Sequence, residues 1–229
     1  MSYNVAIDGP AGAGKSTIAK MIAKKLGFIY VDTGAMYRAM ALYLLREGVD
    51  KQNAEAIAAV CRGADITIRY ENGEQIVLLN GENVNGLIRT EEVGNMASVS
   101  SANPYVREKL VELQKKLAFD NDVIMDGRDI GTVVLPHADV KVYLTASSAE
   151  RAMRRYKELT AKGQKCDLSQ IEADIIERDH RDMTRETSPL RQADDAVCVD
   201  SSDMTIEEVV DAICSLIQEK QECAKNVTV

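Results

Sequence analysis

The chain has 229 residues, of which 45% are hydrophobic, and its 28 lysines and arginines against 36 aspartates and glutamates give a net charge of −8. This length allows one large domain with a full core, and the acidic balance does not suit a general binder of nucleic-acid backbone, which needs a basic surface. Because no apolar run approaches the roughly 20 residues that span a bilayer, we expect neither a nucleic-acid polymer nor a membrane as partner.

The five cysteines are scattered and show neither a CxxC pair nor a metal-ligand spacing. Such isolated thiols are typical of reduced cysteines in a cytosol. The first predicted strand begins within a few residues of Met1, which leaves no room for a signal peptide. We therefore expect a cytoplasmic protein and, since no large apolar surface is evident, a monomer.

Short apolar segments with the character of buried strands recur along the chain, and helical patterns lie between them. Strands are expected at residues 3–8, 28–32, 123–126, 140–144 and 196–200. Strand–helix alternation predicts an α/β fold, a five-stranded parallel sheet with helices on both faces. Four of the strands end at or beside an aspartate, at the edge of the sheet where ligands of such folds bind.

Three helices have sequence signals at their ends. The first is expected to end at Gly27 and the second near Gly48, because glycine terminates helices readily. Thr205 and Glu208 have the spacing of a capping box at the start of the last helix. Its predicted buried stripe comprises Ile206, Val209, Val210, Ile213 and Ile217.

Residues 64–87 interrupt this alternation. Short β-rich runs are separated there by two Asn-Gly pairs, Asn72-Gly73 and Asn80-Gly81. Asn-Gly between such runs is a strong signal for a tight hairpin turn. We therefore predict a small antiparallel β insert within the α/β domain.

The first strand runs into a glycine-rich loop that fits the pattern G-x-x-x-x-G-K-[ST]. Such a loop points backbone N–H groups at phosphate oxygens, and the helix that follows adds its positive end. Lys15 is placed to reach the β- and γ-phosphates, and the Ser16 hydroxyl to bind Mg²⁺. The predicted ATP-binding residues are Gly9, Pro10, Ala11, Gly12, Ala13, Gly14, Lys15, Ser16 and Thr17.

The remainder of the chain distinguishes between classes of P-loop protein. It contains no N-K-x-D guanine-reading motif, which argues against a GTPase. The third predicted strand ends in Asp126-Gly127-Arg128, without a glutamate after the aspartate to activate water, which weakens an ATPase assignment. Many arginines follow, and they suit a reaction between two phosphorylated substrates.

Four motifs in order resemble the bacterial cytidylate kinase family: Asp8-Gly9-Pro10, DTGAMYRA at 32–39, DGRDIGTVVLP at 126–136 and RDHRDMTRETSPL at 178–190. The resemblance implies a nucleoside-monophosphate kinase fold that transfers a phosphoryl group from ATP, with Mg²⁺, to CMP or dCMP. It divides the single domain, 1–229, into a core, a monophosphate-binding region at 33–105 that holds the β insert, and a helical lid with an arginine-rich arm at 148–190.

The resemblance also implies an acceptor site. Arg38, Arg128 and Arg185 would grip the acceptor phosphate, and Thr33, in place of the family's frequent serine, keeps a hydroxyl. Ser98, Arg107 and Asp129 would surround the pyrimidine, and the β insert would wall this pocket. Arg178 and Asp182 would lie near the ribose, and Tyr37 completes the CMP-binding set.

Simpler alternatives stay open for several of these residues. Arg38 could be a solvated helix residue, and Ser98 could cap a helix. Asp129 could orient Arg128 or Arg185 through an ion pair instead of reading the base.

Arg151, Arg154 and Arg155 are spaced to share one helix face. One of them could neutralise charge on the transferring phosphoryl group, with Arg154 or Arg155 favoured, or the three could form a solvated basic face. Residues 160–165 suit a lid tip. The predicted catalytic residues are Lys15, Arg128, Arg154, Arg155 and Arg185. A P-loop kinase of a non-nucleotide metabolite and a non-catalytic nucleotide sensor remain as alternatives.

Overall fold

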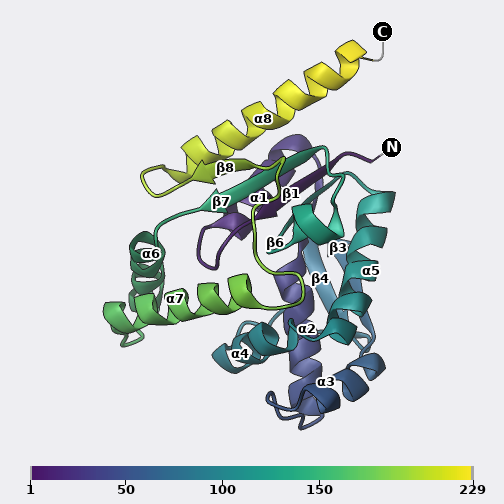
Figure 1. Ribbon diagram of the computed structural model, residues 1–229, viewed down its shortest axis with the longest axis vertical. Helices are drawn as coiled ribbons and strands as arrows, with labels where there is room; N and C mark the ends of the chain where they lie inside the picture. Colours follow the sequence, from purple (N-terminus) through teal and green to yellow (C-terminus); the bar gives the residue numbers. More distant parts are fainter. Residues whose placement is uncertain (1, 228–229) are drawn as a thin grey trace.

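The structure is a computed structural model that describes residues 2–227 (Figure 1). Its centre is a five-stranded sheet in the order β2-β6-β1-β7-β8, and every neighbouring pair is parallel. The strands are β1 (Asn4–Asp8), β2 (Ile29–Asp32), β6 (Val123–Gly127), β7 (Val140–Thr145) and β8 (Val197–Asp200). Each predicted strand is present, with bounds that differ by one residue at one end.

Helices cover both faces of this sheet, because alternate strand residues point to opposite sides. On one face Val5 and Ile7 pack against α1 (Lys15–Leu26) and α8 (Ile206–Val227). On the other face Ala6 packs with α2 (Thr33–Arg46), α4 (Glu91–Ser100) and α5 (Pro104–Asp120). The predicted fold class is therefore confirmed.

The predicted helix ends follow local backbone chemistry. Gly27 caps α1 in the left-handed region at φ 73°. At the start of α8 the Thr205 N–H donates to the Glu208 carboxylate at 2.8 Å, and the Glu208 N–H donates to Thr205 Oγ1 at 3.2 Å, a complete capping box. The predicted stripe of α8 is buried from Val209 onward, but Ile206 is 48% exposed. The prediction was wrong there because Ile206, the first residue of the helix, lies at the rim of a cavity instead of over the sheet.

The β insert is present as β3 (Ile66–Glu71), β4 (Glu74–Leu79) and β5 (Glu82–Asn83), joined by the two Asn-Gly turns. All four turn residues have positive φ, between 51° and 83°, as type I′ hairpin turns require. Gln75 attaches the insert to the main sheet. Its side-chain amide accepts from the Asp32 N–H at 2.9 Å and donates to the Asp32 carbonyl at 3.1 Å, as a paired strand would.

The remaining helices are α3 (Ala54–Val60), α6 (Ser148–Ala161) and α7 (Leu168–Thr184), with a 3₁₀ turn at Cys61–Gly63 and a π-helical turn at Ile130–Val134. Helices α6 and α7 pack together as a hairpin that projects from the sheet (Figure 1), and Gly163, at φ 72°, lies in the turn between them. That this hairpin is a lid remains a prediction. Within residues 2–227 no helix combines the length and apolar character that a membrane span requires.

Candidate active site

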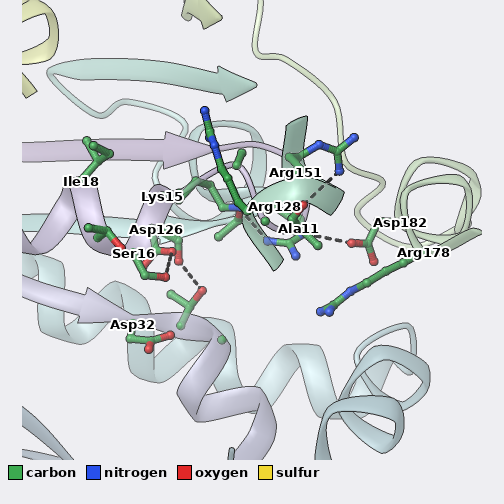
Figure 2. Close-up of a pocket in the computed structure, with 18 of the residues that line it drawn as sticks. Ala11, Lys15, Ser16, Ile18, Asp32, Asp126, Arg128, Arg151, Arg178 and Asp182 are labelled. Carbon is green, nitrogen blue, oxygen red and sulfur yellow. Dashed lines mark hydrogen bonds and ion pairs between the residues drawn. The ribbon is translucent and has the colours of Figure 1, made fainter. Parts of the chain in front are cut away.

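A cavity of about 740 Å³ opens at the carboxyl edge of the parallel sheet. The glycine-rich loop lines one end, and arginines from α2, α6 and α7 are among the residues that line the rest. Figure 2 shows Lys15, Arg128, Arg151 and Arg178, which come from segments far apart in the sequence, around the same cavity. Strand ends gather at this edge because all five strands run in the same direction.

The glycine-rich loop is held against β7 before it enters α1. Gly9 has a φ of 151°, and a β-carbon there would lie 1.9 Å from the Leu144 carbonyl oxygen, so no side chain fits. The helix begins at Lys15, directly after the loop, with Gly14 as its N-cap. The positive end of α1 therefore points into the cavity, which is the arrangement that binds phosphate.

The Lys15 ammonium is buried beneath this loop. Its Nζ donates to the Gly9 carbonyl at 2.8 Å and to the Pro10 carbonyl at 2.7 Å. Burial lowers the pKa of Lys15, and the nearby Arg128 charge lowers it further. These two hydrogen bonds fix the Lys15 ammonium relative to the loop backbone, so the ammonium lies beside the place where the loop would bind phosphate.

Asp126, at the end of β6, lies beside the first turn of α1. Its carboxylate accepts from the Ser16 hydroxyl at 2.9 Å (Figure 2) and from the Tyr30 hydroxyl at 2.8 Å. Burial raises the pKa of Asp126 to about 6, and the Asp32 charge acts in the same direction. One hydroxyl and one carboxylate are hard oxygen ligands of the kind that Mg²⁺ takes beside its waters. These residues fit the metal, and Asp126 was not among the predicted site residues although it ends a predicted strand.

Asp8 fixes the segment that follows β6. Its carboxylate accepts from the Ile130 N–H at 2.8 Å and the Gly131 N–H at 2.7 Å. Burial raises the pKa of Asp8 to about 6. These contacts pin the π-helical turn, and thereby the position of Arg128 and Asp129 immediately before it.

The predicted acceptor arginines come together in the same cavity. Arg128 Nε donates to the Asp182 carboxylate at 2.9 Å, and Arg38 donates to the Ile88 carbonyl at 3.2 Å. Burial lowers the pKa of Arg178 to about 10, and the Arg128 charge adds to the effect. Among the described residues, Arg178 Nε and Arg185 Nη2 are buried donors without a hydrogen-bond partner. Unsatisfied buried donors of this kind are suited to bind an anionic ligand.

The base-side residues form a second group. Ser98 Oγ and the Tyr37 hydroxyl are buried without a hydrogen-bond partner in the described chain, and the Arg107 guanidinium lies 5.5 Å from the Tyr37 ring centre. Burial raises the pKa of Tyr37 to about 12, so the phenol keeps its proton. Thr33 instead donates to the Asp126 carbonyl at 2.7 Å, which joins the start of α2 to β6.

Asp129 pairs with Arg107, and both side chains are buried. It lies 3.9 Å from Arg185, beyond hydrogen-bond distance. Of the two ion-pair partners predicted for Asp129, Arg185 lies within ion-pair distance, whereas Arg128 pairs with Asp182 instead.

The three arginines of the predicted lid share α6 but differ in their contacts. Arg151 is buried, and its guanidinium donates to the Ala146 and Ala11 carbonyls and pairs with Asp179 at 2.7 Å. Arg154 donates to the Ser201 carbonyl at 2.7 Å. Arg155 is half exposed and pairs with Glu158. All three line the cavity (Figure 2 shows Arg151), and a catalytic role for Arg154 or Arg155 stays a prediction.

Two features depart from the predicted site. No residue of the 64–87 insert, all of which the structure describes, lines the cavity, so the insert does not wall the pocket. It reaches the site indirectly, through Gln75 and the Asp32 backbone, while Ser98 and Arg107 come from α4 and α5. A missed pair, Arg89 with Asp32 at 2.7 Å, also lines the cavity. Asp32 is marked in the sequence as a strand end, whereas nothing marks Arg89.

The family model described as cytidylate kinase matches residues 5–219. The chain belongs to the cytidylate kinase family. Its relatives include cytidylate kinases of Caldicellulosiruptor saccharolyticus (52% identical, covering 93% of this chain and 94% of that protein), Listeria innocua (52%; 94% and 96%) and Geobacter sp. (48%; 94% and 93%). This confirms the predicted family and makes the protein a phosphotransferase, so the nucleotide-sensor alternative is wrong.

Solved structures show the same fold at low sequence identity. An uncharacterized protein from Eubacterium ventriosum matches with a TM-score of 0.53 at 12% identity, covering 96% of this chain and 99% of that one. A gluconokinase from Sinorhizobium meliloti matches with a TM-score of 0.50 at 14% identity, covering 98% and 97%. These likenesses concern the fold alone.

Proposed function

We propose that the protein transfers the γ-phosphoryl group of ATP to CMP or dCMP and releases ADP and CDP or dCDP. One observation supports this best. The cavity has a phosphate-binding loop at one end and, at the other, arginines with unsatisfied donors beside a buried hydroxyl-rich pocket. A donor triphosphate and an acceptor monophosphate thus have separate positively charged places in one site.

The reaction needs no strong general base. A phosphate oxygen of the acceptor, already anionic near neutral pH, attacks the γ-phosphorus of ATP, and the bond from that phosphorus to the β–γ bridging oxygen breaks. The electron pair leaves on the β-phosphate of ADP. Catalysis then consists of alignment and charge stabilisation.

The side chains divide these tasks. Lys15 and the backbone N–H groups of the loop would stabilise the β- and γ-phosphates. Arg38, Arg128 and Arg185 would align the acceptor phosphate, since planar guanidinium groups bind phosphate oxygens in pairs. Ser16 and Asp126 would hold Mg²⁺, which supplies a Lewis acid that screens the phosphate charges.

Base and sugar recognition would come from the other half of the site. Cytosine presents an exocyclic amine, a donor that a carboxylate or hydroxyl oxygen can accept. Ser98, Arg107 and Asp129 would provide that recognition, and Arg178 and Asp182 would contact the ribose. We further propose that α6 and α7 close over ATP as a lid, which excludes water from the γ-phosphate.

A panel of nucleoside monophosphates with ATP and Mg²⁺, read by a coupled ADP assay, tests the proposal. We expect turnover with CMP and dCMP, less with UMP and none after chelation of the metal. The same panel should include small alcohols and acids, because phosphorylation of these in place of CMP would favour a metabolite kinase. Gel filtration and cell fractionation would test the expected monomer and cytoplasmic location.

A further inference from the structure

Ser188, in the segment between α7 and β8, has an unusual backbone. Among the described residues, three non-glycine residues have positive φ: Asn72, Asn80 and Ser188. The two asparagines belong to the hairpin turns that require it, whereas Ser188, at φ 51°, belongs to no hairpin. A residue other than glycine rarely adopts the left-handed region of positive φ unless its surroundings hold it there.

The surroundings of Ser188 are two arginines of the active site. Its carbonyl oxygen accepts from Arg185 Nε at 2.7 Å, and its hydroxyl oxygen accepts from Arg107 Nε at 3.0 Å. The segment is anchored just beyond, where the buried Leu190 donates its N–H to the Asp182 carbonyl at 2.8 Å. The left-handed turn thus directs two oxygens of one residue at two arginines, one on α5 and the other directly after α7.

Ser188 completes the set of contacts that orients Arg107. Arg107 Nη1 donates to the Ser101 carbonyl at 3.1 Å, and Nη2 donates to the Asp129 carboxylate. With Nε on Ser188, each of the three guanidinium nitrogens has a partner, so the plane of the group is fixed. Because Arg107 holds Asp129, the hydroxyl of Ser188 also fixes the direction of that carboxylate.

We propose that Ser188 is a positioning residue for base selection, which its hydroxyl controls through Arg107 and Asp129. Ser188 itself does not line the cavity, so it acts through these side chains and not on the nucleotide. This inference rests on the proposed function. The contact with Arg185 uses the backbone carbonyl, so substitution of the side chain leaves the phosphate-binding arginine in place.

The test compares Ser188→Ala with the parent enzyme on CMP and UMP, in turnover and in calorimetric binding. Loss of one hydrogen bond to a charged donor that keeps two others should reduce the CMP-over-UMP preference on the order of threefold to tenfold. The kcat with CMP should stay within about twofold, because the phosphate contacts are unchanged. Ser169→Ala, an exposed serine on α7, is the matched control and should leave both readouts unchanged.

Two further variants separate positioning from a general effect on folding. In an Arg107→Met background, Ser188→Ala should have no further effect on the preference, because the group through which it acts is gone. Ser188→Gly removes the same hydroxyl but suits the left-handed φ, so it should lose the same preference while melting at a higher temperature than Ser188→Ala.

Three outcomes overturn the inference: an unchanged preference in Ser188→Ala, equal losses on both nucleotides, or a full effect that persists without Arg107. Failure of the proposed function is distinguishable from these. A parent enzyme that binds CMP selectively but does not phosphorylate it would refute the proposed reaction, while the binding preferences of the same variants would still decide the role of Ser188.

Discussion

Asp129→Asn tests how the buried pair with Arg107 contributes to stability and to base selection. Each side chain of the pair is 5% exposed. The substitution keeps the shape of the side chain but leaves the arginine charge buried without its counter-charge. Removal of one partner from a buried pair costs about 3–5 kcal/mol, and we expect the lower value, about 3 kcal/mol, because asparagine keeps one acceptor oxygen.

The neighbouring Arg185 adds to the expected loss. Burial lowers the pKa of Arg185, Arg107 lowers it further, and Asp129 opposes both effects. Neutralising Asp129 therefore leaves the Arg107 and Arg185 guanidinium groups without the negative charge that offsets their mutual repulsion. For a chain of this length, about 3 kcal/mol corresponds to a fall in Tm of roughly 6–12 °C.

Differential scanning calorimetry at neutral pH measures this fall. Asp211→Asn is the matched control, since Asp211 makes an ion pair of 2.9 Å with Lys25 at the surface. The Asp211 side chain is 70% exposed and the Lys25 side chain 54% exposed. Exposed pairs contribute little, so the control should melt with the parent. A fall of less than about 3 °C in Asp129→Asn would refute the buried-pair reasoning.

Steady-state kcat/KM on CMP and UMP tests base selection in the same variant. An ionised carboxylate accepts from the cytosine amine and repels the uracil oxygen, whereas asparagine adds a donor. We expect CMP use to fall more than UMP use. Equal losses on both nucleotides would mean that Asp129 only orients arginines, and a preference unchanged within about twofold would remove it from base recognition.

Three other substitutions follow from the same geometry. Lys15→Ala should lower kcat on the order of 10²–10³-fold, or about 3–4 kcal/mol, since the ammonium would stabilise charge moving toward the β–γ bridge. Lys24→Ala, at an exposed site on the same helix, is the control, and a kcat of the Lys15 variant within about threefold of the parent would contradict the P-loop assignment. Arg185→Met should lower kcat on CMP and UMP alike, because it removes a buried donor from the acceptor phosphate, whereas Arg191→Met, at an exposed site, should not. A normal rate of phosphoryl transfer in single-turnover assays would refute the role of Arg185. Ser98→Ala removes a neutral hydrogen bond of roughly 0.5–1.5 kcal/mol and should act mainly on the CMP/UMP ratio of kcat/KM, so an unchanged ratio would return Ser98 to a purely structural role.

Several features of the fold depend only on residues that are close together in the sequence. The strands are short apolar runs, the loop before Lys15 needs glycine where it approaches Leu144, and the two Asn-Gly pairs supply the positive φ of the insert's turns. The capping box at Thr205 requires only residues three apart. Each of these features depends on neighbours along the chain, so the sequence pattern sufficed to predict it.

The pairing of side chains around the cavity depends instead on the packing of distant segments. Arg107 meets Asp129 across 22 residues and Ser188 across 81, and Arg128 meets Asp182 across 54. Sequence motifs identified most of these residues and named Arg128 or Arg185 as the ion-pair partner of Asp129, but they did not identify its pairing with Arg107 or the pairing of Arg128 with Asp182. The correct partners follow from where α5 and α7 pass the end of β6, which no local pattern encodes.

The same reason explains the errors in position. The β insert was predicted to wall the pocket. Instead, Gln75 of the insert hydrogen-bonds the Asp32 backbone at the end of the edge strand β2, so the insert reaches the site only through that backbone. Ile206 continues the apolar period of α8 yet lies beyond the sheet that would bury it. The sequence by itself determined the strands, the phosphate loop and the kinase motifs, because residues close along the chain set backbone geometry. Only the tertiary structure decided which charges are paired and which donors stay free, because burial and long-range contact exist only once the helices pack on the sheet.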